Sequence, residues 1–442
     1  MKKLFTSLLL LVTALCFCLA GCNLGGGNQA PDEPIGGDVP PKDMVFTTLE
    51  LDKYKIVYDT DYPEFRTPIY ELQNTLLIKY GASPSITADT SLNRSSYEIL
   101  IGDTNRYDAN GKIMEYSISV VDKKLKIDVG GVFSLEKAIE YLSNNVFTGQ
   151  TVTLNEGLVY SKSFLTKKQA VTTGSTIRVM TSNVLAESFD NGSYRETEYR
   201  VELFAGSLLA YTPDVVGVQE TDADWNMYLD KYLDKIESSY GIKYERYWGT
   251  YEDKVNYSSL IYRADKFTVG DSGVEVFSWW TAPNFNHSYH MRNVSWAQFK
   301  FIDNPSKTFI LANTHWSYRT EHQDIYGTNE LRTQCRNETN TILTTLKNSY
   351  AGTPIFLTGD FNTSLSFFTS KNTGLNLTSS YNVISEQAKS AGTSVSTVPT
   401  SNHFDHIFGT GSYSVKRFEF FSSTNYKNEL SDHPFVYADV AF

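Results

Sequence analysis

A carboxylate and an amide suited to hydrolytic chemistry follow one apolar run late in the chain. Residues 355–357 are Ile-Phe-Leu, Pro354 precedes them and Gly359 follows, which is typical of a buried strand ending in a sharp turn. Asp360 and Asn362 come next, and alternation along an extended chain points both side chains the same way. A carboxylate can orient or deprotonate water, and an amide can donate to an anionic oxygen. Taken alone, this stretch favours an Asx turn after a strand.

Five further polar strand ends in the same half of the chain favour a site instead. Each follows or lies in a short apolar stretch, and together they carry Asn183, Glu220, His315, Asp405, and Asp432 with His433. Helical patterns at 197–210 and 329–349 separate some of these stretches. Polar groups at the ends of buried strands gather at one edge of a sheet, so we expect a site there.

This ordered set, over residues 177–442, resembles the endonuclease/exonuclease/phosphatase superfamily with its deoxyribonuclease-I-like fold. The resemblance implies a four-layered α/β sandwich, in which two packed mixed β-sheets are flanked by helices. It implies that Glu220 binds a divalent metal with Asn183 beside it, and that Asp432 is a second acid at the metal. It also implies a phosphate ester as substrate.

The remaining roles follow from the same resemblance. Asp360 matches the residue that orients or deprotonates the attacking water. Asn362 matches the phosphate-binding amide, and Asn183 and Arg292 match groups that support the phosphate. The other catalytic residues implied are His433, with Asp405 as its acid, and His315.

The chemistry requires these residue types independently of the resemblance. Phosphate esters are anionic and repel hydroxide, so a hard cation must neutralise charge in the transition state. Mg²⁺ prefers oxygen ligands, usually one or two carboxylates with waters, and Glu220 with Asp432 fits that preference; Mn²⁺ is the alternative. An imidazole held by a carboxylate, as expected for His433 with Asp405, is a better cationic donor.

One departure from the family pattern concerns His315. Some relatives support this histidine with an acid just before a strand ending Tyr-Arg, and here Asn256 stands near that place, with Glu252 or Asp253 as substitutes. Other histidines and the tryptophans are expected to be structural; these are His287, His290, His322, His403, His406, Trp279, Trp280, Trp296 and Trp316. The loop after Trp280 remains an alternative substrate contact.

The N-terminal residues predict export and a lipid anchor. Lys2 and Lys3 precede an apolar stretch at 8–20 that is too short to span a membrane and is typical of a signal peptide. Residues 19–22, Leu-Ala-Gly-Cys, resemble the lipobox of bacterial lipoproteins, which implies acylation of Cys22 and attachment to the outer face of a bacterial membrane. After the signal at 1–21, residues 22–46 are rich in Gly and Pro and predict a flexible tether.

A small α/β domain is expected at 47–165, followed by a linker at 166–176. Its elements are a helix at 68–80, a strand at 98–101, a hairpin at 116–129 and a second helix capped by Ser134. Residues 97–106 with 129–142 are similar to the N-terminal domain of bacterial α-glucuronidases and hexosaminidases. In those enzymes the domain accompanies catalysis, so we expect a packing role, with glycan contact as the weaker alternative.

The charge balance bears on the substrate. The chain has 39 basic and 50 acidic residues, and residues 177–442 have 22 and 30, a net charge of −8. Duplex DNA binding depends on lysine and arginine at phosphates, so nucleic acid is not favoured. We therefore expect a monomeric, exported, lipid-anchored, metal-dependent phosphoesterase. A secreted nuclease and a non-enzymatic glycan-binding surface lipoprotein are the alternatives.

Overall fold

The structure is a computed structural model, and residues 42–442 form one compact unit. It describes residues 44–46, 48–91, 94–165, 169–189, 192, 194–247, 257–280, 291–317, 328–365, 377–380, 382–383, 385, 387, 403–421 and 429–442. Cys22, Asn256, Glu252 and Asp253 therefore lie outside the described residues. None of the helices within these ranges is long and apolar enough to cross a membrane.

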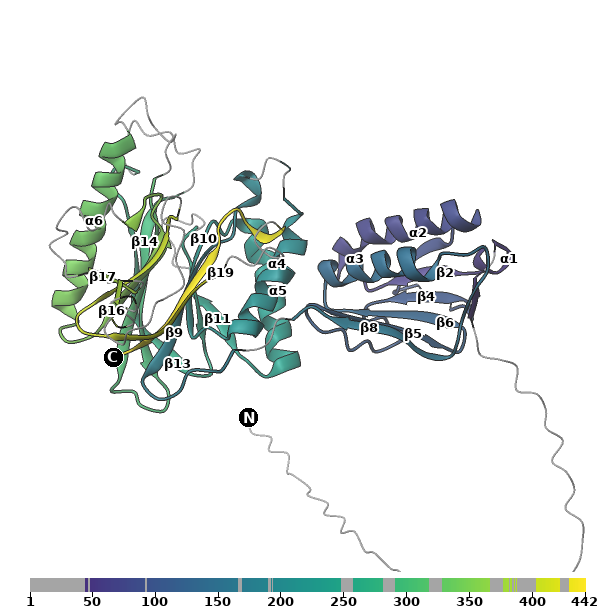
Figure 1. The fold of residues 1–442 in the computed structure, drawn as a ribbon, viewed down its shortest axis with the longest axis horizontal. Coiled ribbons are helices and arrows are strands. Elements are labelled where there is room, and N and C mark those ends of the chain that lie inside the picture. Colours follow the sequence, from purple (N-terminus) through teal and green to yellow (C-terminus); the bar gives the residue numbers. More distant parts are fainter. Residues whose placement is uncertain are drawn as a thin grey trace, which may run out of the picture. The chain divides into compact units, whose positions relative to one another are not determined.

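The first part of the chain builds a six-stranded N-terminal sheet with two helices on one face (Figure 1). Its strands, in spatial order, are β3 (Ser85–Ala88), β2 (Lys55–Tyr58), β4 (Glu98–Ile101), β6 (Lys124–Val129), β5 (Glu115–Val121) and β8 (Gly157–Ser163). The first four pair in parallel, whereas β5 pairs antiparallel with both of its neighbours, β6 and β8. The covering helices are α2 (Arg66–Tyr80) and α3 (Val132–Tyr141). Shorter elements are β1 (Met44–Phe46), α1 (Thr48–Leu51), β7 (Val152–Leu154) and the turns Pro63–Phe65 and Leu142–Val146.

Local sequence signals place most of these elements correctly. The β5–β6 hairpin turns at Asp122 and Lys123, both with positive φ, as a tight two-residue turn requires. Gly81 ends α2 in the left-handed conformation. The prediction that Ser134 caps the second helix is wrong. Helix α3 begins at Val132, and the Ser134 side chain bonds to Glu202 instead.

Two six-stranded mixed sheets follow. Sheet I runs β11 (Tyr244–Tyr247), β12 (Leu260–Arg263), β10 (Val215–Gln219), β9 (Thr176–Asn183), β20 (Phe435–Ala441) and β19 (Ser414–Phe421). Sheet II runs β13 (Phe267–Val276), β14 (Asn293–Phe301), β15 (Thr308–His315), β16 (Ile355–Asp360), β18 (Asp405–Thr410) and β17 (Leu377–Ser379). In each sheet the central pair is parallel: β9 with β10, and β15 with β16.

Helices cover the outer faces of both sheets (Figure 1). They are α4 (Thr197–Tyr211) and α5 (Ala223–Tyr240) beside sheet I, and α6 (Thr328–Ser349) beside sheet II, with a short turn at Glu187–Phe189. One apolar core, with Val179 and Phe309 among its members, fills the space between the sheets. A second packs Leu343 of α6 against Ile355 of sheet II. The predicted fold class, a four-layered α/β sandwich after a small α/β region, is confirmed.

A polar junction interrupts the inter-sheet core near the ends of the parallel strands. The Asn313 amide of sheet II donates to the carbonyls of Val218 (2.9 Å) and Ser259 (3.0 Å) on the sheet I side. Its oxygen accepts from Gln219 (2.6 Å) and Thr358 (3.1 Å). Gly217 allows this approach, because a Cβ there would overlap the Thr358 hydroxyl and the Asn313 amide. The junction therefore fixes how the two sheets face each other.

The N-terminal sheet and helices α4 and α5 share one continuous apolar core, which includes Met114, Phe133, Phe204 and Tyr232. Glu202 of α4 is fully buried in it. Its carboxylate accepts hydrogen bonds from the backbone N–H groups of Met114 (2.9 Å) and Ser134 (3.2 Å) and from the Ser134 hydroxyl. Burial raises the pKa of Glu202, and these three donors oppose that rise. A side chain of one half thus satisfies the first turn of α3 in the other.

We expect Gly217→Ala to lower the free energy of unfolding by about 1–3 kcal/mol, because the added methyl overlaps the polar junction. Gly149→Ala is the matched control, since a Cβ at Gly149 meets its nearest neighbour at an ordinary 3.4 Å. Urea unfolding of both variants measures the difference. Equal urea midpoints for the two variants would show that the polar junction accommodates the methyl group at no cost in stability.

Candidate active site

The polar strand ends meet at one edge of the two sheets. Asn183 is the last residue of β9, and Glu220 directly follows the adjacent parallel strand β10. In sheet II, His315 and Asp360 end the parallel strands β15 and β16 and are register partners. Parallel strands end at the same edge, so side chains far apart in sequence come together there.

One oxygen of Asp360 is the centre of the cluster. Asp360 Oδ2 lies 3.1 Å from Asn183 Nδ2, 3.3 Å from His315 Nε2 and 3.7 Å from His433 Nε2. Burial opposes ionisation of this carboxyl group, yet His433, His315 and the Asn362 N–H outweigh it and hold the pKa of Asp360 well below its usual range. Asp360 is therefore a carboxylate, as an acceptor for water must be.

Asn183 links the two central acids. Its Nδ2 donates to Glu220 Oε1 at 2.9 Å as well as to Asp360, while its Oδ1 accepts from the Leu185 N–H at 3.0 Å. The second oxygen of Glu220 accepts from the Ala186 N–H at 3.0 Å. The amide and the Glu220 carboxylate are therefore held by the backbone that follows β9.

Two site residues have left-handed backbone conformations. The φ angles are 66° at Glu220 and 49° at Asn362. Residues other than glycine adopt this backbone region at a cost of about 1–3 kcal/mol. At Asn362 the Asp360 carboxylate accepts the backbone N–H at 2.8 Å, so the predicted Asx turn and the site coexist. The Asn362 amide donates to the Trp316 carbonyl at 3.0 Å and lies 3.2 Å from His315 Nε2.

His433 and Asp405 form a close pair. The distance from His433 Nδ1 to Asp405 Oδ2 is 2.7 Å, and Asp405 is fully buried. Burial lowers the pKa of His433, but Asp405 and Asp360 outweigh this and raise it well above its usual value. Burial raises the pKa of Asp405 to about 6 despite His433. The geometry thus holds a cationic imidazole with Nε2 toward Asp360.

His315 has a different partner from any considered in the sequence. Arg292 NH1 lies 3.0 Å from His315 Nδ1. A guanidinium can only donate, so Nδ1 must accept and the ring proton sits on Nε2, facing Asp360. Arg292 therefore lies behind the histidine. The two site histidines have opposite partners at Nδ1, a guanidinium for His315 and a carboxylate for His433.

Asp432 is placed apart from the other acids. Its side chain is exposed, and Oδ1 lies 3.4 Å from the Ser431 hydroxyl. Within the described residues, groups of three potential ligands lie within 4.8 Å only in the sets Glu220–His315–Asp360 and Asp360–Asp405–His433. Its role at a metal stays a prediction.

Sequence reasoning missed two residues that position the site. Arg200 of α4 is fully buried and donates to the carbonyls of Val184 (3.0 Å), Leu185 (2.7 Å) and Leu430 (3.3 Å), on both sides of the cluster. The Ser431 hydroxyl donates to the Asn183 carbonyl at 2.8 Å and accepts from the His433 N–H at 3.1 Å. Nothing in the local sequence distinguishes this arginine from a solvated one.

Among the residues expected to be structural, His403, His406 and the four tryptophans are buried away from these contacts. His406 faces Thr363, whose carbonyl lies 3.1 Å from Nε2, and burial lowers the pKa of His406 to about 4. His403 is buried against His406 and Phe420. The four tryptophans belong to the core beside α6. His287, His290, His322 and the loop after Trp280 lie outside the described residues.

The donor set fits a hard divalent cation. Glu220 and Asp360 are buried carboxylates within ligating distance of each other, and Mg²⁺ usually takes one or two protein carboxylates with waters. His315 Nε2 lies near both, but in this tautomer it carries the ring proton. The residue that would hold the cation is therefore Glu220, with Asn183 and Asp360 beside it.

The chain matches one known protein family. The sequence pattern of the Endonuclease/Exonuclease/phosphatase family matches residues 180–433. No curated protein matches the chain.

Several solved structures match at low identity. An endonuclease/exonuclease/phosphatase from Bacteroides vulgatus is 22% identical, with 61% of this chain and 100% of that chain covered and a TM-score of 0.46. The human Nocturnin catalytic domain with bound sulfate is 20% identical, with 61% and 95% covered and a TM-score of 0.46. A mannosyl-6-phosphatase from Bacteroides thetaiotaomicron is 19% identical, with 60% and 100% covered and a TM-score of 0.43.

We expect Glu220→Gln to weaken Mn²⁺ or Mg²⁺ binding by at least about tenfold, because it removes a charged ligand. Asp360→Asn should weaken it less, since the main task of Asp360 is the water. Isothermal titration calorimetry of both variants measures this, with exposed Glu196→Gln as the control. Equal losses of metal affinity in the two site variants would contradict separate roles for Glu220 and Asp360.

Proposed function

The chain belongs to the endonuclease/exonuclease/phosphatase family of hydrolases, and we propose that it hydrolyses a small sugar-linked or lipid-linked phosphoester at the outer face of a bacterial membrane. The observation that carries this proposal is the convergence of His315, His433 and Asn183 on one oxygen of Asp360, with Glu220 beside them. Two carboxylates, two imidazoles and two amides are suited to water attack on a phosphorus centre.

The residues divide the work as follows. Glu220 would hold a divalent cation, which would neutralise charge on the phosphoryl oxygens. Asp360, kept ionised by its neighbours, accepts a hydrogen bond from the attacking water and orients it. His433 is a cationic donor to the phosphoryl group, with Asp405 holding its Nδ1 proton. Asn362 and Asn183 place amide donors beside the same point.

Charge supports a small substrate. Residues 177–442 carry a net charge of −8, whereas an enzyme that follows duplex DNA neutralises several phosphates with lysine and arginine. A small phosphoester needs only the cation and the two histidines at one phosphate, with Arg292 behind His315. Mg²⁺ is the proposed cation, with Mn²⁺ as the alternative.

The proposed location follows from the N-terminal sequence. The Leu-Ala-Gly-Cys stretch ending at Cys22 resembles a lipobox, and a Gly- and Pro-rich tether follows it. Two acyl chains give stable membrane attachment, which one does not. The tether would hold the folded unit, which begins near residue 42, away from the bilayer surface.

The substrate class is tested by assaying the same protein on plasmid DNA, RNA, sugar phosphates and phospholipid headgroup esters, with Mg²⁺ and with Mn²⁺. We expect turnover of a small ester and weak activity on plasmid. Asp360→Asn, carried through every assay, identifies activity that belongs to this site. Efficient plasmid degradation at physiological salt, with nothing comparable on small esters, would replace the proposal with a secreted nuclease.

We expect Asp405→Asn to reduce kcat nearly as much as His433→Ala, with the double variant little worse than either, because the two residues act as a unit. Rates for the four proteins form the double-mutant cycle. Effects that multiply independently would mean that the pair does not act together.

The pH profile gives a second readout of this pair. Asp405 raises the pKa of His433, so activity that needs cationic His433 is lost only as pH rises through that raised value. Asp405→Asn removes the carboxylate and should move the basic limb of the kcat profile to lower pH. A limb that stays in place would assign it to another group.

We expect Cys22→Ser to release the protein from membranes or to block its processing. Cell fractionation with an antibody against the folded part measures the distribution. The buried Cys335→Ser variant is the control for loss of a thiol elsewhere. A wild-type protein already found free outside the cell would contradict the anchor.

A further inference from the structure

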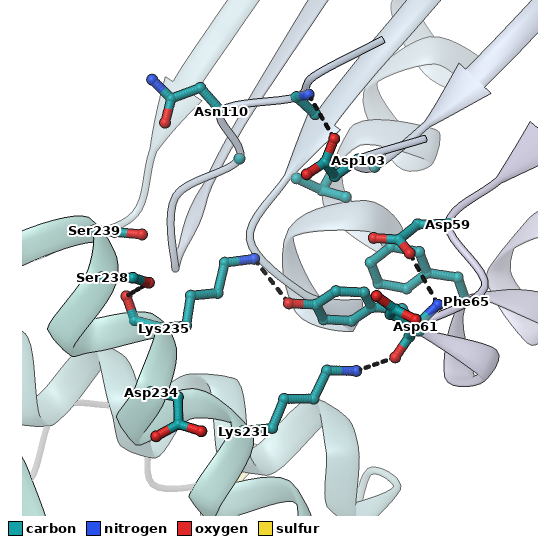
Figure 2. A pocket seen from close by; sticks show the side chains of 15 residues that line it. Asp59, Asp61, Phe65, Asp103, Asn110, Lys231, Asp234, Lys235, Ser238 and Ser239 are labelled. Carbon is teal, nitrogen blue, oxygen red and sulfur yellow. Dashed lines mark hydrogen bonds between the residues drawn. The ribbon is translucent and has the colours of Figure 1, made fainter. Parts of the chain in front are cut away.

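A cavity of about 450 Å³ lies where the N-terminal sheet meets helix α5 (Figure 2). The carboxyl ends of parallel strands β2, β4 and β6 supply one wall, through Asp59, Asp103 and Val129. The other wall is α5, through Lys231, Asp234, Lys235 and Ser239. Ligands of open α/β sheets bind at the carboxyl ends of the strands, and small-molecule sites measure about 300–1,000 Å³.

Asp59 is the feature that points to a ligand. It directly follows β2, only 6% of its surface is exposed, and it lines the cavity. Its Oδ1 accepts from the Asp61 N–H at 2.9 Å, but no described residue donates to Oδ2. Burial, with the charges of Asp61, Asp89 and Asp103, raises the pKa of Asp59 to about 6. This oxygen lies at the cavity wall without a donor from the protein, so it is free to accept from a ligand that carries a hydrogen-bond donor.

The opposite wall offers donors. Lys235 Nζ donates to the Gly130 carbonyl (2.8 Å) and the Tyr62 hydroxyl (3.2 Å). Lys231 Nζ donates to the Asp61 carbonyl (2.6 Å) and to Glu64 (3.0 Å). An ammonium has three N–H groups, so each lysine keeps one for a ligand. Figure 2 shows both lysine side chains extending from α5 toward the strand ends.

The cavity therefore presents acceptors and donors side by side. Acceptors are Asp59 Oδ2, the second oxygen of Asp103, whose Oδ1 accepts from Ala109 at 3.2 Å, and Asp234. Donors are the two lysines and the amide of Asn110. A ligand that satisfies both must itself carry donors and acceptors at close spacing, as vicinal hydroxyl groups do.

Other ligand classes fit less well. An anion would face the carboxylates of Asp59, Asp61, Asp103 and Asp234. A metal ion needs several ligands close together, and the described residues bring three such groups within 4.8 Å only at the active site. An amine offers donors but nothing for the lysines and Asn110 to donate to.

We propose that this cavity is a binding site for a neutral saccharide of one or two sugar units. The site uses none of the residues assigned to hydrolysis, so it stands whether or not the proposed substrate is correct. Both walls of the cavity belong to one compact unit with a shared apolar core.

The test uses the full-length protein and saturation-transfer NMR, followed by calorimetry. The probes are glucose, galactose, mannose, xylose and N-acetylglucosamine with their β-1,4 disaccharides, and glucuronate and spermidine as charged counterparts. We expect at least one neutral saccharide to bind, and Asp59→Asn and Asp234→Asn each to weaken it at least tenfold. Exposed Asp52→Asn is the matched control in the same half and should bind as wild type.

Two readouts keep the result decisive. Circular dichroism and phosphoesterase turnover check that each variant is folded, and exposed Asp234 can be changed without disturbing the core even if Asp59→Asn destabilises it. Binding of no neutral saccharide, binding of spermidine or glucuronate alone, or saccharide binding unchanged in the Asp234→Asn variant would each overturn the proposal. A failed substrate panel with intact saccharide binding would leave this site standing and refute only the proposed substrate.

Discussion

The active site depends on the contact that holds the two sheets face to face. Asn183 and Glu220 come from sheet I, while His315 and Asp360 come from sheet II, so a small shift between sheets would separate them. The Asn313 amide prevents that shift by bonding to carbonyls and side chains across the junction. Leaving such buried groups unpaired costs about 1–3 kcal/mol each, so the junction permits a much smaller range of sheet alignments than apolar packing would. Apolar contacts set the spacing of the sheets, and the polar junction sets their alignment.

Within the site, two imidazoles close to one carboxylate oxygen are treated differently. Asp405 behind His433 favours the cation, whereas Arg292 behind His315 can only donate, so that Nδ1 accepts and the ring proton lies on Nε2. Both rings therefore present an N–H toward Asp360. The partner at Nδ1, and not the residue type, distinguishes the two histidines.

The family resemblance implied the fold class, and local sequence predicted most strand ends because apolar runs, turn glycines and alternation are short-range signals. It also brought Asn183, Glu220, His315, Asp360, Asn362, Asp405 and His433 to one edge. It could not predict the partner of His315, because residues 23 positions apart meet only after β14 pairs with β15. The misplaced cap at Ser134 has the same origin, since its true partner lies 68 residues later. The resemblance of the first domain to those of glycan-processing enzymes, and the anchor at Cys22, stay predictions.

Helix α4 has a consequence for comparing related genes. A helix outside a sandwich normally keeps a solvated face, yet in α4 every residue but Glu198 is buried. One side packs on sheet I, and the other meets the N-terminal half through Glu202 and through Gly206 against Met114. Where an accessory domain packs on this helix, both faces of the helix are buried, and its sequence therefore no longer shows an amphipathic pattern. In other members of the family, the polarity pattern of this one helix should therefore indicate whether the hydrolase half evolved alone or with a partner domain. The same pattern should be readable in a gene fragment from which that domain has been lost.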